Sequence, residues 1–166
     1  MWELVNEEII DLQQQGNHYI KTCIAQDDTI VILYHPLFYK HSIFARLIKP
    51  NGTRTSEFQG DLKLFAIKGM NNQYELLHLF IRQEDRNKGY GTILMNELIA
   101  CARKRCFNYI EGNLRNIDDE SDGKLLHFYG CKFGFHIDKN RNIRWDNPNQ
   151  VTLNYLEHNA YNRHPS

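Results

Sequence analysis

The sequence has no long hydrophobic run and no excess of either charge. None of its apolar stretches approaches the roughly 18 residues that span a bilayer, and the first ten residues, MWELVNEEII, are acidic, unlike a signal peptide. Lysine plus arginine and aspartate plus glutamate both number 20, which argues against a nucleic-acid backbone or an anionic membrane as the main partner. We therefore expect a cytoplasmic protein with neither a nucleic-acid nor a membrane partner.

The sequence contains few cysteines. The four cysteines, Cys23, Cys101, Cys106 and Cys131, form no C-x-x-C pair. This spacing argues against a zinc site and against a disulfide framework. We expect reduced cysteines, with Cys101 buried as a small apolar side chain, and no bound metal.

The periodicity of the chain predicts one domain, residues 1–166, of mixed α/β class. Trp2, Val5, Ile9 and Leu12 recur at helical spacing and Gly16 follows, so a helix is expected over 3–15. Strands are expected over 18–25, 29–35, 41–49, 53–58, 62–68, 74–81, 108–114, 135–138 and 143–145, and further helices over 88–105 and 121–133. Periodicity does not decide between a short helix over 151–158 and a frayed tail. The order of elements predicts a mostly antiparallel sheet flanked by helices.

Residues 74–98, YELLHLFIRQEDRNKGYGTILMNEL, are the part of the chain most informative about function. A strand leads through a charged turn into a helix, and Gly89 and Gly91 lie where the turn becomes helix. The first helical turn has backbone N–H groups without intrahelical partners and a partial positive charge. Glycines let an anion approach these donors closely. The stretch therefore predicts a phosphate or pyrophosphate held by backbone, with Arg86 and Lys88 adding charge.

Three common phosphate-binding motifs are absent. The chain contains no G-x-x-x-x-G-K-[ST] run, and Leu94 stands where a dinucleotide fingerprint has its third glycine. A kinase-type loop would require a lysine strand and a downstream H-R-D motif, and the sequence has neither.

The run Arg86-Asn87-Lys88-Gly89-Tyr90-Gly91 resembles motif A, [QR]-x-x-G-x-[GA], of the acyl-CoA-dependent N-acetyltransferase superfamily (GNAT). KGYG-x-x-LMN-x-L, from Lys88 to Leu98, is similar to the histone acetyltransferase branch. Asn87 replaces a frequent glycine, and asparagine tolerates unusual backbone angles. The resemblance covers about 41–146 and implies a GNAT-like acyl-CoA N-acyltransferase fold. Residues 1–36, a helix and a hairpin, depart from the usual entry into that fold.

The resemblance implies transfer of an acetyl group from acetyl-CoA, as co-substrate, to a primary amine. It assigns cofactor binding to Leu79, Phe80, Ile81, Arg86, Asn87, Lys88, Gly89, Tyr90, Gly91 and Thr92. A catalytically silent acyl-CoA-binding or protein-interaction module of the same fold is the alternative, and another nucleotide-binding α/β domain is a third. The sequence identifies neither the acceptor amine, whether small molecule or protein, nor the oligomeric state.

The candidate catalysts are Glu75 and Tyr129, with His78 as an alternative base. Glu75 falls where the histone acetyltransferase branch has its glutamate base, and His78 is a second candidate base on the same strand. The family often has a tyrosine four residues before a Gly-Phe pair, but here Tyr129 lies five before Gly134. Tyr129 is therefore either the acid that protonates the leaving thiolate, reached through a one-residue insertion, or a core aromatic.

Overall fold

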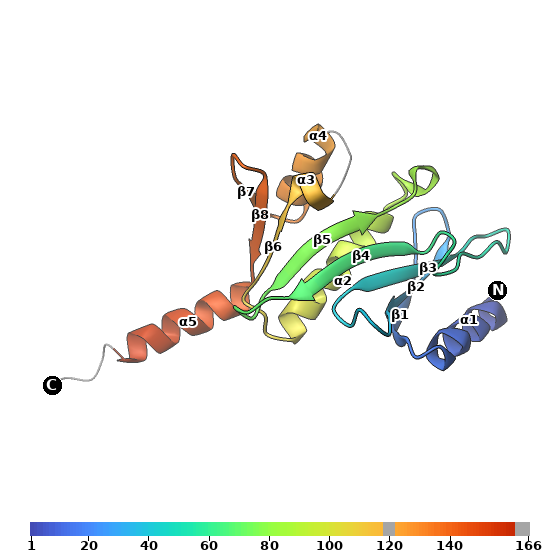
Figure 1. Cartoon of the computed structure of the whole chain (residues 1–166), viewed down its shortest axis with the longest axis horizontal. Coiled ribbons are helices and arrows are strands. Elements are labelled where there is room, and N and C mark those ends of the chain that lie inside the picture. The colour runs from blue at the N-terminus through green and yellow to red at the C-terminus, as the bar shows by residue number, and fades with distance from the viewer. Residues whose placement is uncertain (118–121, 162–166) are drawn as a thin grey trace. The chain divides into compact units, whose positions relative to one another are not determined.

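The computed structural model describes residues 1–117 and 122–161, which form a mixed α/β fold (Figure 1). The helices are α1 (Trp2–Gln14), η1 (Gln83–Asp85), α2 (Tyr90–Lys104), α3 (Leu114–Ile117), α4 (Asp122–Leu125), η2 (Leu126–Lys132) and α5 (Pro148–Tyr161). The strands are β1 (His18–Ile24), β2 (Ile30–His35), β3 (Ile43–Ile48), β4 (Leu62–Lys68), β5 (Tyr74–Phe80), β6 (Tyr109–Asn113), β7 (His136–Ile137) and β8 (Asn142–Asp146). Their order in the sheet is β1-β2-β3-β4-β5-β6-β8-β7. The expected fold class, a mostly antiparallel sheet with flanking helices, is confirmed.

The described chain divides into two compact units. The first consists of Met1–Ile67 and Leu77–Leu98, and the second of Lys68–Leu76 and Ile99–Ser166. The expectation of one domain over 1–166 stays a prediction.

In the first unit, α1 and the β1–β2 hairpin match the prediction for residues 1–36. Gly16, at φ +84°, ends α1, where its N–H donates to Gln13 O and the N–H of Asn17 donates to Leu12 O. These two hydrogen bonds together form a Schellman motif, which favours glycine at the left-handed position. The apolar face of α1 packs on β2 and β3 in one core cluster, formed by Val5, Leu12, Ile30, Ile32, Tyr34, Phe44 and Ile48.

A buried ionic network joins α1 to the sheet of the same unit. Arg46 of β3 donates to Glu8 Oε2 of α1 at 2.9 Å and forms an ion pair with Asp61 at 3.3 Å. Asp61 also accepts hydrogen bonds from the hydroxyls of Tyr34, at 2.8 Å, and Thr55. Because this network and the apolar core both include α1, the helix is an integral part of the first unit.

The strand predicted over 53–58 is wrong. Only isolated bridges occur there, including Ile48 with Arg54. The backbone groups of Ser56 pair locally, since Ser56 N donates to Gln59 O and Gln59 N donates back to Ser56 O. Phe58 is exposed. Hydrogen bonds within a local turn therefore replace the strand pairing that was predicted for residues 53–58.

In the second unit, β6 lies between the start of β5 and β8. Tyr74, Glu75 and Leu76 pair in parallel with Ile110, Glu111 and Gly112, and β8 runs antiparallel to both β6 and β7. The core includes the Tyr74 and Phe107 rings, whose centroids are 4.4 Å apart. Helix α5 follows β8 and extends away from it (Figure 1), with Val151, Leu153, Tyr155 and Leu156 exposed. The undecided tail is thus helical over Pro148–Tyr161.

The segment predicted as a helix over 121–133 is helical from Asp122 to Lys132, and most of it is a π-helix rather than an α-helix. Ser121 lies outside the described residues, α4 spans only Asp122–Leu125, and Leu126–Lys132 form a π-helix. A π-helix pairs residue i with i+5 in place of i+4, so it takes up one extra residue. Tyr129, which lies five residues before Gly134 in the sequence, is within this π-helix.

Candidate functional site

Two residues of the charged turn between β5 and α2 have left-handed backbone conformations. Asn87 and Gly89 both adopt left-handed angles, with φ +60° and +81°. Asparagine and glycine are the residues that enter this region most readily. A Cβ added to Gly89 would lie 3.5 Å from the Gln26 side chain, so the strain of a substitution there comes from the backbone rather than from a clash.

Helix α2 begins at Tyr90, directly after this turn. Ile93 N–H donates to Gly89 O at 3.2 Å, the first bond of the helical ladder. The N–H groups of Tyr90, Gly91 and Thr92 precede that bond and have no acceptor within the helix. One face of the helix is apolar and buried, and its members are Tyr90, Leu94, Leu98 and Cys101. The helix start thus presents three backbone donors and the positive end of a fifteen-residue dipole.

The cationic side chains of the turn are held by contacts within the first unit. Arg86 Nε donates to the carbonyl of Ile81 at 3.2 Å, which ties the turn to the end of β5. Lys88 Nζ lies 3.7 Å from Asp85 Oδ1. Asp85 is completely buried. The two motif cations therefore shape the turn as well as adding charge to it.

The β1–β2 turn contacts the beginning of α2. Tyr90 donates its hydroxyl hydrogen to Asp27 Oδ2 at 2.8 Å. Burial, supported by this bond to a carboxylate and opposed by Thr29, raises the pKa of Tyr90 to about 12. Burial also disfavours the charge of Asp27, but hydrogen bonds from Tyr90 and Thr29 outweigh it and hold the pKa of Asp27 below its ordinary value. Lys21 of β1 adds an ion pair to Glu97 of α2.

Strand β5 does not keep a strict two-residue alternation. Tyr74 and Leu76 are buried, and the next buried residue is Leu79, three positions later. Alternating faces require even spacing, so the pattern changes phase between Leu76 and Leu79. Phe80 is exposed and Ile81 half-buried. The burial pattern therefore places an irregularity in β5 between Leu76 and Leu79.

The two candidate catalysts, Glu75 and Tyr129, belong to the second unit. Glu75 is half-buried and is the register partner of Glu111 on β6. Gln73 Nε2 donates to Glu111 Oε1 at 3.2 Å. His78, the second candidate base, is half-buried in the first unit, with its ring 6.3 Å from that of Phe80.

Tyr129 has no exposed surface and lies among aromatic rings of the second unit. Its ring meets Phe128 and Phe135 edge-on at 4.9 and 5.8 Å. Phe135 N–H donates to Tyr129 O at 2.9 Å, and Gly134 N–H donates to Gly130 O at 3.1 Å, which closes the end of the π-helix. These contacts fit a core aromatic residue, which is one of the two alternatives for Tyr129.

Comparison with known proteins identifies the family. A sequence profile described as the acetyltransferase (GNAT) family matches residues 48–135, more than half of the chain. The chain belongs to the GNAT acetyltransferase family. No curated protein matches its sequence.

Three solved structures illustrate the similarity of other chains to this GNAT protein. A GNAT-family acetyltransferase from Staphylococcus aureus Mu50 has 18% identity and a TM-score of 0.45, covering 64% of this chain and 68% of its own. Ard1 from Thermoplasma volcanium has 14% identity and a TM-score of 0.44, with coverages of 62% and 69%. Tetrahymena GCN5 has 17% identity and a TM-score of 0.40, with coverages of 66% and 71%.

Three features of this GNAT protein were not predicted from its sequence. Asp85 is the buried carboxylate of the motif turn, Lys49 reaches it from the end of β3 at 3.3 Å, and Glu111 lies beside Glu75. The four-residue spacer containing Asp85 offers no periodic signal. Lys49 and Glu111 each lie more than 30 positions from their partners, beyond any local pattern.

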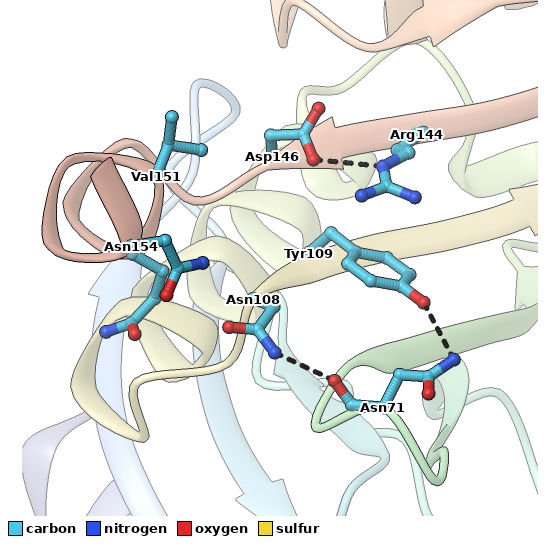
Figure 2. Close-up of a pocket in the computed structure, with 8 residues that line it drawn as sticks. Asn71, Asn108, Tyr109, Arg144, Asp146, Val151 and Asn154 are labelled. Atoms are coloured by element: carbon cyan, nitrogen blue, oxygen red, sulfur yellow. Dashed lines mark hydrogen bonds and ion pairs between the residues drawn. The ribbon is translucent and has the colours of Figure 1, made fainter. Parts of the chain in front are cut away.

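A polar pocket of about 420 Å³ lies within the second unit (Figure 2). Its lining is rich in side-chain amides and comprises Asn71, Asn108, Tyr109, Arg144, Asp146, Gln150, Val151 and Asn154. Arg144 stacks over the ring of Tyr109 at 3.8 Å and donates to Asp146 at 2.9 Å, while Asn71 donates to the hydroxyl of Tyr109 at 3.3 Å. None of the residues proposed for catalysis or cofactor binding lines it.

Within residues 1–117 and 122–161, no helix is both long and apolar enough to cross a bilayer. In the same residues, no group of three or more His, Cys, Asp or Glu is placed to hold a metal ion. The expected cytoplasmic location stays a prediction.

Proposed function

We propose that this GNAT protein transfers the acetyl group of acetyl-CoA to a primary amine. The observation that carries the proposal is the turn between β5 and α2. Left-handed Asn87 and Gly89 lead into three helix-start N–H groups, and Lys49 and Lys88 both lie against Asp85 of the turn. A helix start of this kind binds a diphosphate through backbone donors. Such a ligand fits the acyl-CoA on which the family's acyl transfer depends.

In the proposed binding mode, the diphosphate of acetyl-CoA contacts the backbone from Asn87 to Thr92, with Arg86 and Lys88 adding charge. The backbone N–H groups of Leu79, Phe80 and Ile81 are proposed to hold the pantetheine arm and the thioester carbonyl. The phase change in β5, just before Leu79, supports this assignment because irregular strands free backbone donors from the ladder. These donors would stabilise negative charge on the carbonyl oxygen.

In the proposed chemistry, Glu75 accepts a proton from the attacking ammonium or amine. The amine nitrogen then forms a bond to the acetyl carbon, the carbon–sulfur bond breaks, and the sulfur leaves as thiolate. Tyr129 is proposed to return a proton to that thiolate. An alkyl amine has a pKa near 10.4, so a base raises its reactivity at neutral pH.

A second candidate function is a catalytically silent acyl-CoA-binding or protein-interaction module. One observation favours it: Tyr129 is fully buried among Phe128 and Phe135. In that case acetyl-CoA still binds, and acetylation of amines is absent.

Calorimetric titration with acetyl-CoA, CoA and ATP tests the proposal. We expect acetyl-CoA and CoA to bind and ATP not to bind. Gly89→Asp should weaken binding sharply, because it places an anion among the phosphate donors. Gly134→Asp is the matched control, with a similar left-handed φ of +72°, open space around the position and the same added charge. Unchanged acetyl-CoA affinity in a folded Gly89→Asp protein would contradict the proposed binding mode.

A further inference from the structure

The buried carboxylate of Asp85 is surrounded by more positive charge than it can neutralise. Arg82 donates from Nε and Nη2 to Asp85 Oδ2, at 3.1 and 2.9 Å. On the other oxygen, Lys49 Nζ lies 3.3 Å and Lys88 Nζ 3.7 Å from Oδ1. Three cations thus share one anion. The exposed carboxylate of Glu84 lies 3.3 Å from Arg82 Nη1 and offsets a second positive charge. Three cations and two carboxylates leave this cluster with a net positive charge.

Both lysine side chains of this cluster are partly exposed, while the carboxylate between them is not. Lys49 keeps 28% and Lys88 33% of side-chain surface, against 0% for Asp85. An ammonium group has three donors, so one contact with Asp85 does not exhaust it. The arrangement therefore holds each lysine from the buried side and leaves its remaining surface available to an anion.

Lys49 is held firmly although it lies outside the motif. It follows β3 directly, and its backbone is fixed by two hydrogen bonds across a turn, from Lys49 N to Thr53 O and from Gly52 N to Lys49 O, both 2.8 Å. Ile48 before it is fully buried. A fixed backbone reduces the entropy lost when the side chain engages a ligand.

A purely structural role accounts for Arg82 better than for Lys49. Arg82 makes a two-donor contact with Asp85, the geometry in which a guanidinium pairs most strongly with a carboxylate. That contact alone supplies a counter-ion for the buried anion. A second and third cation add self-repulsion within the cluster, which an incoming phosphate would relieve.

We propose that Lys49 is a phosphate-binding residue of the acyl-CoA site, positioned by Asp85. The inference rests on the proposed function and adds a residue from β3 to the binding turn. CoA contains two kinds of phosphate, the diphosphate and the 3′-phosphate. The shared chemistry is a phosphate dianion or diphosphate paired with an ammonium group.

Titration of Lys49→Met with CoA and with dephospho-CoA tests the inference. We expect CoA affinity to fall about tenfold or more, as for the loss of a hydrogen bond between charged groups. An equal loss for dephospho-CoA assigns Lys49 to the diphosphate, and a loss confined to CoA assigns it to the 3′-phosphate. Lys49→Arg should restore most of the affinity because it keeps the charge.

Lys63→Met is the matched control. Lys63 is also a half-buried lysine of the first unit, but it lies over the ring of Phe44 at 5.4 Å rather than beside Asp85. If Lys49→Met binds both ligands with wild-type affinity, or if Lys63→Met loses as much, the inference is overturned. Failure of the wild-type protein to bind CoA would instead refute the proposed function, so the two failures are distinguishable.

Discussion

Replacing Arg46 by methionine should severely destabilise the first unit. The Arg46 side chain is 3% exposed and pairs with Glu8 at 2.9 Å and with Asp61 at 3.3 Å. Methionine fills similar space but leaves both carboxylates without their shared cation. Removing one partner of a buried ion pair typically costs about 3–5 kcal/mol in free energy of unfolding. For a protein of this size, that corresponds to a fall in Tm of about 6–20 °C.

The penalty of Arg46→Met should depend on pH. Burial raises the pKa of Asp61 above its ordinary value, although Arg46, Thr55 and Tyr34 oppose the rise. Loss of Arg46 removes one of these opposing interactions, so the folded variant binds a proton on Asp61 more readily than the unfolded chain does. A raised folded pKa contributes stability at low pH that is lost as pH rises through the folded pKa. The stability gap between variant and wild type should therefore narrow on acidification from neutrality.

Urea unfolding of wild type, Arg46→Met and Arg54→Met at several pH values measures both effects. Arg54 contacts the other oxygen of Glu8 at 2.7 Å, but its side chain is 53% exposed. Exposed ion pairs contribute about 0–1 kcal/mol, so Arg54→Met should cost little. Equal losses in the two variants, or a gap that widens on acidification, would refute the burial argument.

Three further predictions concern the site. Glu75→Gln should lower kcat by about 10²- to 10⁴-fold at neutral pH with a confirmed amine acceptor, as expected for loss of a general base. The deficit should shrink as pH rises; a wild-type pH–rate profile would exclude Glu75. Tyr129→Phe should lower kcat by about 10²-fold with unchanged acetyl-CoA affinity, whereas an unchanged kcat would leave Tyr129 a core aromatic alone. The pKa of Asp27 is lower in the folded protein than in the unfolded chain, where it is about 3.9. Ionised Asp27 therefore stabilises the folded state above this pH, and that stability is lost as pH falls through the folded pKa. Asp27→Asn should thus flatten the acid limb of stability, measured by urea midpoints between about pH 5 and 2.5, and an unaltered limb would contradict the Tyr90–Asp27 bond.

Features set by short-range rules were predictable from the sequence. The left-handed angles of Asn87 and Gly89 follow from side-chain sterics at single residues. The buried face of α2 follows from helical spacing of Tyr90, Leu94 and Leu98, and the end of α1 from one glycine. The family resemblance rests on the same local run of residues. Because each depends on neighbours within a few positions, one sequence was sufficient to predict them.

Features that depend on distant partners came only from the tertiary structure. Lys49 meets Asp85 across 36 positions, and Glu8 meets Arg46 across 38. Glu111 lies beside Glu75 only because β5 and β6 pair in parallel. A charged residue looks the same in the sequence whether the folded chain places it at the surface or in the core. The low-dielectric interior and the partners it supplies decide what that charge does, and chain folding determines both.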